Sequence, residues 1–483
     1  SAASDVYKRQ DYNSIAEMSY HGIAPLKESA VRALQAGTDM DMVSCGFLNT
    51  LEGSLEEGKV TEEQINTACR RVLEAKYKLG LFENPYKYCD TLRAQQDTYT
   101  AQHRVEARKI ATETFVLLKN EKKLLPLRRK GKIALIGPMA DARNNMCGMW
   151  SMTCTPSGHR TLLESLRLAV GNEAEILYAK GSNIYYDAAL EKGAVGIRPL
   201  VRGDNGRLLD EALQTAARAD VIVAALGECA EMSGESASRT KLEIPEAQQD
   251  LLKALVKTGK PVVLLLFTGR PLVLNWEDTH IPSILNVWFG GSETGDAVAD
   301  VLFGKVNPSG KLTTTFPRSV GQLPLFYNHL NTGRPDPDSC IFDRYSGNYI
   351  DESNEPLYPF GYGLSYTNFV YGKLRLSSNI LFKSGELTAS VTVTNTGDYD
   401  GYETVQLYLR DIYADISRPI KELKNYRRIF LQKGESQEIT FTITENDLKY
   451  YNSELQYVYD PGEFEIMVGT NSRDVQQERF IAE

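Results

Sequence analysis

A loop with three carboxylates and one guanidinium is the part of the sequence whose residue types most directly suggest chemistry. It runs from Gly227 to Arg239 and holds Glu228, Glu231 and Glu235 among small residues. A carboxylic acid on such a loop can act as a general acid when burial raises its pKa. Taken alone, the loop fits a solvated acidic segment somewhat better than a catalytic one. The elements around the loop are needed to choose between these two interpretations.

These elements predict a mainly parallel sheet with helices on both faces. Continuous apolar runs alternate with helical patterns, and such runs are typical of strands that are buried on both faces. Ligands in these sheets bind at the carboxyl ends of strands, so the loops after Leu226 and Trp288 are the first places to look. The expected strands are residues 133–136, 176–178, 221–226, 261–266 and 284–288, and the expected helices are 161–169, 246–257 and 293–303.

The pattern changes near Leu374, where apolar and polar residues begin to alternate with period two. The alternation is clear over residues 387–394, 405–409 and 464–468, and turn signals such as 395–397 separate these runs. Short alternating strands with frequent turns predict an antiparallel β-sandwich of fibronectin type III or immunoglobulin type over the last 110 residues.

The chain before residue 83 is predicted to be helical. Residues 27–35 are amphipathic, and residues 61–79 begin with a capping box at Thr61 and Gln64. These elements are too few for a complete domain, which suggests the tail of something larger. A polar, turn-rich linker is expected next over residues 83–98, and then a helix over 99–118.

The first ten residues do not resemble a natural start. There is no initiator Met, and residues 5–10 resemble the translation of a transposon end used to build sequencing libraries. We therefore expect residues 1–10 to be an assembly artefact and the gene to continue upstream. Without a natural start, a missing signal peptide says nothing about localisation.

Composition and charge exclude several classes of function. A net charge of −9 with no long basic run argues against nucleic acid as a partner. No apolar run approaches the roughly 18 residues of a membrane span. Seven cysteines and five histidines are scattered without metal-ligand spacing, so no metal site is expected. Cys147 and Cys154 could form a disulfide, but free buried thiols are the preferred interpretation.

Several ordered motifs give the chain a resemblance to glycoside hydrolase family 3, from Asp11 to the C-terminus. Each motif is matched in sequence order, which makes the combination far more specific than any one of them. The matching stretches are 11–15 (DYNSI), 21–22 (HG), 36–42 (AGTDMDM), 71–82, 233–239 (SGESASR), 288–295 (WFGGSETG), 307–312 (NPSGKL) with 316–317 (FP), and 358–367 (YPFGYGLSYT).

The resemblance implies a multidomain chain of α/β and β parts. A remnant of a (β/α)8 barrel, an α/β sandwich with a mainly parallel sheet and a C-terminal fibronectin type III-like β-sandwich are expected. The implied boundaries are 1–10 for the artefact, 11–82 for the barrel remnant, 83–105 for a linker, 106–330 for the α/β sandwich, 331–373 for a connecting segment and 374–483 for the fibronectin type III-like domain.

The resemblance also implies the site residues. Asp11 matches the family's nucleophile, although Gln10 and Tyr12 replace the usual Ser and Trp around it. Glu235 matches the acid/base, with Glu231 and Glu228 as alternatives because this loop varies. A retaining glycosidase needs two such carboxyl groups about 5–5.5 Å apart. Trp150, Tyr12 and Arg239 are further candidates for substrate contact, and neither a metal nor an organic cofactor is expected.

The implied activity is that of a retaining, exo-acting β-glycosidase that removes terminal β-D-glucosyl residues. β-Xylosidase or broader β-glycosidase activity is the alternative, and a non-catalytic carbohydrate-binding protein is the alternative of another class. The expected substrates are β-linked oligosaccharides or aryl and alkyl β-glucosides. A periplasmic or secreted location and a homodimer are also anticipated. Because most of the barrel would precede Asp11, the chain by itself is expected to be inactive and to expose apolar surface.

Overall fold

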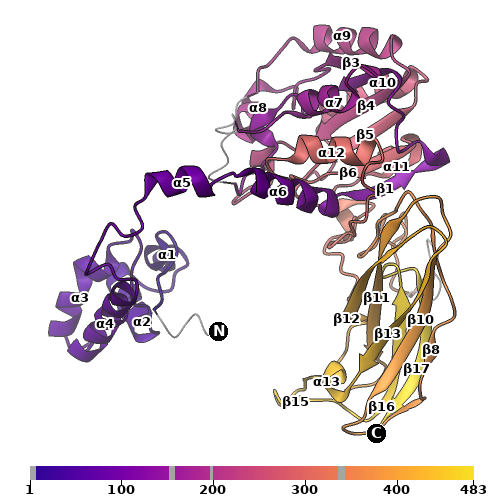
Figure 1. Ribbon diagram of the computed structural model, residues 1–483. Helices are drawn as coiled ribbons and strands as arrows, with labels where there is room; N and C mark the ends of the chain where they lie inside the picture. Colours follow the sequence, from indigo (N-terminus) through magenta and orange to yellow (C-terminus); the bar gives the residue numbers. More distant parts are fainter. Residues whose placement is uncertain (1–6, 152–157, 196–199, 336–342) are drawn as a thin grey trace. The chain divides into compact units, whose positions relative to one another are not determined.

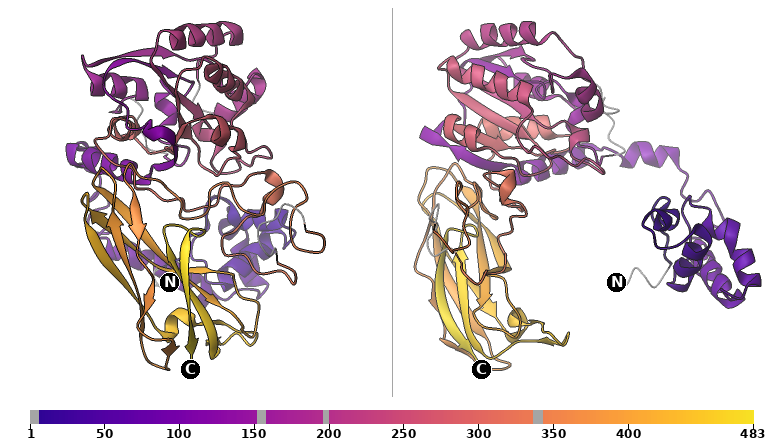
Figure 2. Two further views of the ribbon diagram at one scale, coloured as in Figure 1. Left: turned by 90° about the vertical axis from the view of Figure 1, so that its right-hand side faces the viewer. Right: turned by 180° about the vertical axis from the view of Figure 1, so that it is seen from behind.

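The protein is described here by a computed structural model, which covers residues 7–151, 158–195, 200–335 and 343–483 (Figures 1 and 2). The chain divides into two compact units, Ser1–Thr100 and Ala101–Glu483. Each unit is described by itself. None of the helices in the described ranges is long and apolar enough to cross a membrane.

Unit 1 is a small group of helices around a short stretch of paired backbone. Arg9 and Met40 form a parallel bridge, and the amide of Gln10 donates to the carbonyl of Met40. The capping box at Thr61 and Gln64 is confirmed, because each side chain bonds the other residue's backbone amide. The helices are α1 (Ser14–Tyr20), α2 (Leu26–Gln35), α3 (Gly46–Glu56), α4 (Glu62–Lys78) and α5 (Thr91–Asp97).

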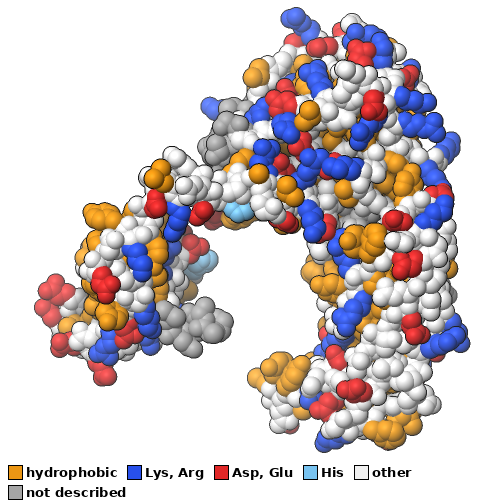
Figure 3. Space-filling model, viewed as in Figure 1, with side chains coloured by type: hydrophobic (Ala, Val, Ile, Leu, Met, Phe, Trp, Pro, Cys, Tyr) orange, Lys and Arg blue, Asp and Glu red, His pale blue; other side chains and the backbone are white. Residues whose placement is uncertain are grey.

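The buried apolar side chains of unit 1 are few. They form two small clusters, and many large apolar side chains on the same helices are exposed instead (Figure 3). The exposed ones include Tyr20, Leu48 and Tyr77 on the helices, and Phe82 and Tyr86 lie exposed in the turns after α4. Exposed apolar surface of this kind marks a place where other protein or a ligand is expected to bind.

Unit 2 begins with a six-stranded sheet in the order β1-β6-β5-β4-β2-β3 (Figure 1). β1 is antiparallel to β6, and every other neighbouring pair is parallel, which confirms the predicted sheet. The strands are β1 (Val116–Asn120), β2 (Gly131–Ile136), β3 (Ala174–Ala179), β4 (Val221–Gly227), β5 (Val262–Phe267) and β6 (Ser283–Asn286).

Helices cover both faces of this sheet, as the apolar strands require. Side chains of α7 (Leu162–Val170) and α12 (Thr294–Leu302) pack in one core cluster with one face of the strands. Side chains of α9 (Asn205–Ala217) and α10 (Glu246–Lys257) pack in a second cluster on the other face. The carboxyl ends of the parallel strands therefore emerge along one edge, with their loops between the two helical layers.

A β-sandwich follows, as the alternating pattern predicted. One sheet has the order β13-β10-β7 with β8 also paired to β10, and the other has the order β12-β11-β16-β17-β9. Their inward side chains form one buried apolar cluster. The strands are β7 (Phe369–Tyr371), β8 (Arg375–Leu376), β9 (Ile380–Leu381), β10 (Leu387–Asn395), β11 (Gly401–Asp411), β12 (Glu422–Leu431), β13 (Ser436–Ile443), β16 (Gly462–Gly469) and β17 (Val475–Ala482), with the short pair β14 (Tyr450–Tyr451) and β15 (Tyr457–Val458) beside them.

Two expectations about local structure are wrong. The helix expected over 99–118 ends early, because α6 (Ala101–Thr114) stops and β1 pairs with β6 from Val116 onward. Cys147 is disulfide-bonded rather than free. Cys154 lies outside the described residues, so the pairing suggested for it stays a prediction.

Candidate active site

The loop after β4 leaves the sheet in a fixed direction. Gly227 has a φ of 131°, and a Cβ there would lie 2.0 Å from the carbonyl oxygen of Phe267, so only glycine fits. The buried amide of Gln248 exchanges two 2.8 Å hydrogen bonds with the backbone of Gly227. The amide of Glu228 then donates to the carbonyl of Phe267 at 2.7 Å. These contacts set the first residues of the loop against the end of β5.

Glu228 closes the base of this loop. It is 0% exposed, and its Oε1 lies 2.8 Å from Nη1 of Arg239 and 3.1 Å from Nε of Arg270. Its Oε2 accepts from the hydroxyl of Thr268 at 2.8 Å and from the amide of Gly269 at 3.2 Å. Both oxygens are therefore occupied, and neither can reach a ligand outside the protein.

The middle of the loop is fastened to the segment after β5. Nη2 of Arg270 donates to the carbonyls of Met232 and Ala237, the second at 2.8 Å. A Cβ on Gly269 would lie 1.8 Å from the hydroxyl oxygen of Ser233, so the side chain of Ser233 packs directly on the backbone of Gly269. The amide of Ala230 donates to the buried Asn145 at 2.9 Å, which joins the loop after β2 to the same group.

Glu235 lies at the tip of the loop fixed in this way. Gly234 packs on Met149, the amide of Ala237 donates to the carbonyl of Gly234, and Ser236 takes a left-handed φ of 57°. Among the described residues, the exposed carboxylate of Glu235 has no recorded hydrogen bond or ion pair. A carboxyl group held on a rigid turn and open to solvent can donate a proton to, or remove one from, a bound ligand.

The other predicted residues of unit 2 lie around this loop. Glu231 is half-buried in a 3-10 turn at Ala230–Met232. Trp150 is 70% exposed on the loop after β2, so core packing does not explain it. Arg239 is mainly buried in its ion pair with Glu228, and its Nη2 donates to the carbonyl of Glu243. Trp150 is thus available to a ligand, whereas Arg239 acts within the loop.

Sequence reasoning missed Arg270, which follows β5 in a Thr-Gly-Arg-Pro segment. The available signal was its position just after an apolar parallel strand, the same signal that pointed to Glu235. Arg270 also lines a cavity of about 710 Å³ together with Gly269, Trp288, Phe289 and Lys311. Trp288 has a left-handed φ of 51°, a conformation that is uncommon for a bulky residue and often found near functional sites.

The thiol of this loop is not a nucleophile. Burial raises the pKa of Cys229 to about 12, and its Sγ donates to the carbonyl of Ala194 at 3.0 Å. Reactive cysteines need a lowered pKa and access to solvent. Within the described ranges, no group of three or more His, Cys, Asp or Glu side chains could hold a metal ion. Carboxylates are therefore the groups of this loop that are suited to acid–base chemistry.

Asp11 lies in unit 1, directly after residues 8–10, whose backbone pairs with residues 39–40. Asp39 fixes this pairing, because its carboxylate accepts from the amide of Lys8 at 2.8 Å and from Arg71 at 3.1 Å. Among the described residues, the carboxylate of Asp11 accepts one hydrogen bond, from the adjacent amide of Tyr12 at 2.7 Å, and both residues are exposed, Tyr12 by 62%. Asp11 thus stands at the carboxyl end of an extended segment that runs parallel to its neighbour.

The parallel α/β sheet, the fastened carboxylate loop and the β-sandwich together define a class of multidomain proteins with an α/β domain followed by a β-sandwich. Residues 115–366 match the glycosyl hydrolase family 3 C-terminal domain, and residues 403–472 match the fibronectin type III-like domain. The first match covers more than half of the 483 residues, and the chain belongs to glycoside hydrolase family 3.

The relatives agree on the family and span two sugar specificities. The chain is 45% identical to a periplasmic β-glucosidase of Salmonella typhimurium over 97% of this chain and 62% of that protein. It is 37% identical to a β-xylosidase of Formosa agariphila over 96% of this chain and 62% of that protein. A crystal structure of a β-glucosidase from Listeria innocua in complex with glucose has a TM-score of 0.87 and 37% identity, covering 99% of this chain and 63% of that one. The chain thus spans about three-fifths of the length of these relatives.

Proposed function

We propose that the protein to which this chain belongs is a retaining, exo-acting β-glycosidase, with β-glucosidase as its first activity. The observation that carries the proposal is Glu235, an exposed carboxyl on a turn whose base and middle are tied to the sheet. Membership of glycoside hydrolase family 3 and the β-glucosidase relatives support the same activity.

In this proposal Glu235 is the acid/base. It protonates the glycosidic oxygen in the first step and removes a proton from water in the second. Its alternatives in the loop are less suitable, since Glu228 is enclosed by donors and Glu231 is half-buried. A group that must switch between acid and base needs room for both the leaving group and the water, and exposure at the tip supplies it.

Asp11 is the proposed nucleophile. Its place at the carboxyl end of residues 8–10 is where barrel enzymes hold their catalytic groups. The ionised carboxylate would attack the anomeric carbon, which forms a glycosyl–enzyme ester while the leaving group takes the proton of Glu235. Tyr12 and Trp150 supply exposed aromatic faces on which a sugar ring can stack.

β-Xylosidase activity is the second candidate, because the Formosa agariphila relative has that name at 37% identity. A non-catalytic carbohydrate-binding protein remains the alternative of another class. The proposed substrates are β-linked oligosaccharides and aryl or alkyl β-glucosides, and a Listeria innocua β-glucosidase variant has been solved with laminaribiose. The Salmonella relative also supports a periplasmic location, and a homodimer remains a proposal.

The decisive experiment is an assay of aryl β-glucoside beside aryl β-xyloside. The 483-residue chain should be tested alone and together with any coding sequence that precedes it in the gene. Asp11→Ala is expected to abolish turnover, and Glu235→Ala is expected to lower it about 10²–10⁴-fold on poor leaving groups. Added azide should restore turnover of Glu235→Ala on an activated aryl glucoside and yield a glycosyl azide, because azide needs no general base.

Glu231→Ala and Glu228→Gln serve as the matched carboxylate variants. If azide rescued Glu231→Ala and not Glu235→Ala, the acid/base would be Glu231. A folded protein with intact Asp11 and Glu235 that hydrolyses neither glycoside, but binds them, would replace the proposed enzyme by a carbohydrate-binding protein. Preference for the xyloside would replace β-glucosidase by β-xylosidase.

A further inference from the structure

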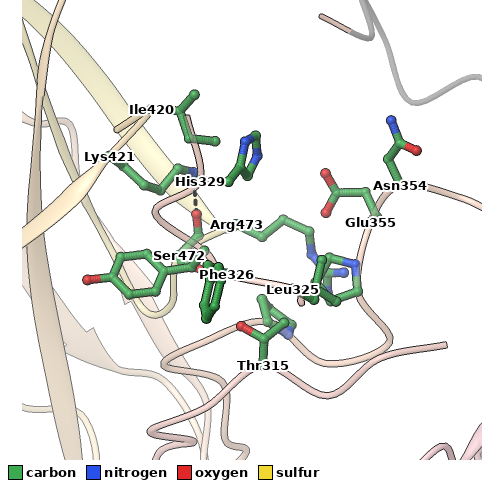
Figure 4. Close-up of a pocket in the computed structure, with 13 residues that line it drawn as sticks. Thr315, Leu325, Phe326, His329, Asn354, Glu355, Ile420, Lys421, Ser472 and Arg473 are labelled. Atoms are coloured by element: carbon green, nitrogen blue, oxygen red, sulfur yellow. Dashed lines mark hydrogen bonds between the residues drawn. The ribbon is translucent and has the colours of Figure 1, made fainter. Parts of the chain in front are cut away.

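A second concave site lies in unit 2 where the segment after the parallel sheet meets the β-sandwich (Figure 4). Its cavity is about 230 Å³, and it shares no residue with the loop that carries Glu235. Its walls come from four stretches far apart in the sequence, near residues 326, 355, 421 and 473. A further cavity of about 480 Å³ shares five of the lining residues, so the site continues beyond its first chamber.

The walls of this cavity are held rigidly. The carbonyl of His329 accepts from the amide of Ile420 at 3.0 Å, which pairs two of the walls. The carbonyl of Glu355 accepts from Nε of Arg318 at 3.0 Å. The buried side chain of Asn471 accepts from the amide of Arg473 at 2.9 Å and so fixes the turn between β16 and β17. A site that is already formed loses little conformational entropy when a ligand binds.

Polar groups with unused hydrogen-bonding capacity face the cavity. The ammonium of Lys421 donates to the carbonyl of Ser472 at 2.5 Å, which leaves two of its protons available. The nearest recorded carboxylate to Arg473 is that of Asp474, at 3.9 Å. The carboxylate of Glu355 has no recorded partner among the described residues and lies across the cavity from Lys421, with Arg473 reaching between them (Figure 4). Burial lowers the pKa of Lys421, against the opposing charges of Glu355 and Glu465.

The cavity therefore offers both kinds of hydrogen-bonding partner and one aromatic face. Lys421 and Arg473 donate, Glu355 accepts, and the ring of Phe326 is 60% exposed at the edge. A hydroxyl group donates and accepts at once, so neighbouring hydroxyls on a ring can use all three polar side chains. The apolar face of the same ring can lie on Phe326. We propose that this cavity binds a single neutral pyranose sugar unit.

The size and charge of the cavity limit the classes of ligand that it can bind. Drug-sized ligands occupy about 300–1,000 Å³, so a chamber of about 230 Å³ suits one ring. Glu355 facing the two cations disfavours a small anion, because a carboxylate repels it and already balances part of their charge. An apolar ligand would leave the charged groups desolvated and without partners.

The test uses methyl β-D-glucopyranoside and the 483-residue chain, with Glu235→Gln present so that no turnover interferes. Saturation-transfer NMR and calorimetry should detect binding, which Phe326→Ala and Arg473→Gln should each weaken at least tenfold. Phe326→Tyr keeps the ring and should retain binding. Phe382→Ala is the matched control, because Phe382 is also 60% exposed but does not line the cavity.

Each outcome decides the proposal. Absence of saccharide binding, or binding unchanged in Phe326→Ala and Arg473→Gln, would overturn it. Displacement of the glucoside by millimolar inorganic phosphate would assign an anion site instead and overturn it too. The inference does not rest on the proposed catalytic function, since binding is measured in a variant that lacks the proposed acid/base.

Discussion

Two glutamates of one loop have opposite surroundings. Glu228 is enclosed by two guanidinium groups, a hydroxyl and an amide, whereas Glu235 is exposed seven residues later. The first therefore maintains the loop, and the second is available to a ligand. A buried ion pair that loses one partner leaves the other charge uncompensated, so the two positions should respond differently to the same substitution.

We predict that Glu228→Gln lowers the free energy of unfolding of unit 2 by about 3 kcal/mol, because Arg239 and Arg270 lose their counter-charge. Glu235→Gln should change it by less than about 0.5 kcal/mol. Urea unfolding followed by circular dichroism measures both values. Equal effects for the two variants would contradict the assigned roles.

A buried carboxyl on α11 (Asn275–His280) makes stability depend on pH. Burial raises the pKa of Glu277 from 4.5 to about 7, and its Oε1 has no hydrogen-bond partner in the described structure. The folded state holds this proton more tightly than the unfolded state. Ionising Glu277 therefore destabilises the folded state. This destabilisation is absent below pH 4.5, grows as the pH rises and is complete above pH 7.

We predict that Glu277→Gln stabilises unit 2 at pH 8 relative to the parent, by up to about 3 kcal/mol for a shift of this size. At pH 4.5 the free energies of unfolding of the two proteins should differ little, because Glu277 is then protonated in the folded state. Urea unfolding at both pH values tests the difference. A stabilisation that is the same at both values would show that the titration of Glu277 is not responsible.

The burial of the carboxylates in the loop after β4 is determined by neighbouring loops rather than by the sequence of that loop. The three carboxylates could be identified from residues 228–235, but their different burial depends on Arg270 and on Asn145, which is 85 residues from its partner Ala230. Single-sequence patterns contain no information on such long-range contacts. The role of Asp11 came from the resemblance alone, since nothing in its local pattern distinguishes it.

At the scale of elements, the strands and helices of the α/β sheet follow the apolar periodicity closely. The helix over 246–257 was predicted at its observed bounds, because its apolar stripe and both ends are clear. α9 was not predicted. The helix that contains α6 was predicted to extend too far, because Val116–Asn120 is apolar enough to form either a helix or a strand. These residues form a strand because they pair with β6, which is over 160 residues away in the sequence.

The contact between Gly269 and the side chain of Ser233 fixes the position of the loop that carries Glu235. We predict that Gly269→Ala lowers turnover by about 10²-fold, because its Cβ would lie 1.8 Å from the hydroxyl of Ser233 and must push the loop away. Aryl glucoside kinetics measure the effect. Adding Ser233→Gly should restore most of the activity, and failure of this rescue would mean that the loss has another cause.

At the scale of the whole molecule, the segment around α5, between the two units, has few buried contacts that would protect it from proteolysis. Every residue of α5 is exposed, and the structure divides between Thr100 and Ala101. Segments with few buried contacts open readily and are cut first. The predicted linker over 83–105 remains a prediction, although its composition and the exposure of α5 agree.

We predict that brief trypsin treatment cuts near Arg93 and leaves a resistant fragment that contains the α/β sheet and the β-sandwich. Mass spectrometry of the fragments and calorimetry of the resistant one test this. The fragment should keep its own unfolding transition, because its three core clusters lie beyond Ala101. Initial cleavage inside the sheet or the sandwich would contradict the division.

The ion pair between Glu228 and Arg239 has a consequence for exchange of sequence between relatives. It ties the two ends of the ten residues 229–238, of which Cys229 and Met232 pack in the core of the sheet whereas Glu235, Ser236 and Ser238 are exposed. Loop length adds little to the free energy of closure, about 0.6 kcal/mol for each doubling. The exposed tip of this segment is thus the part that evolution or an engineer can replace, because the ion pair and the buried residues keep the rest of the loop in place.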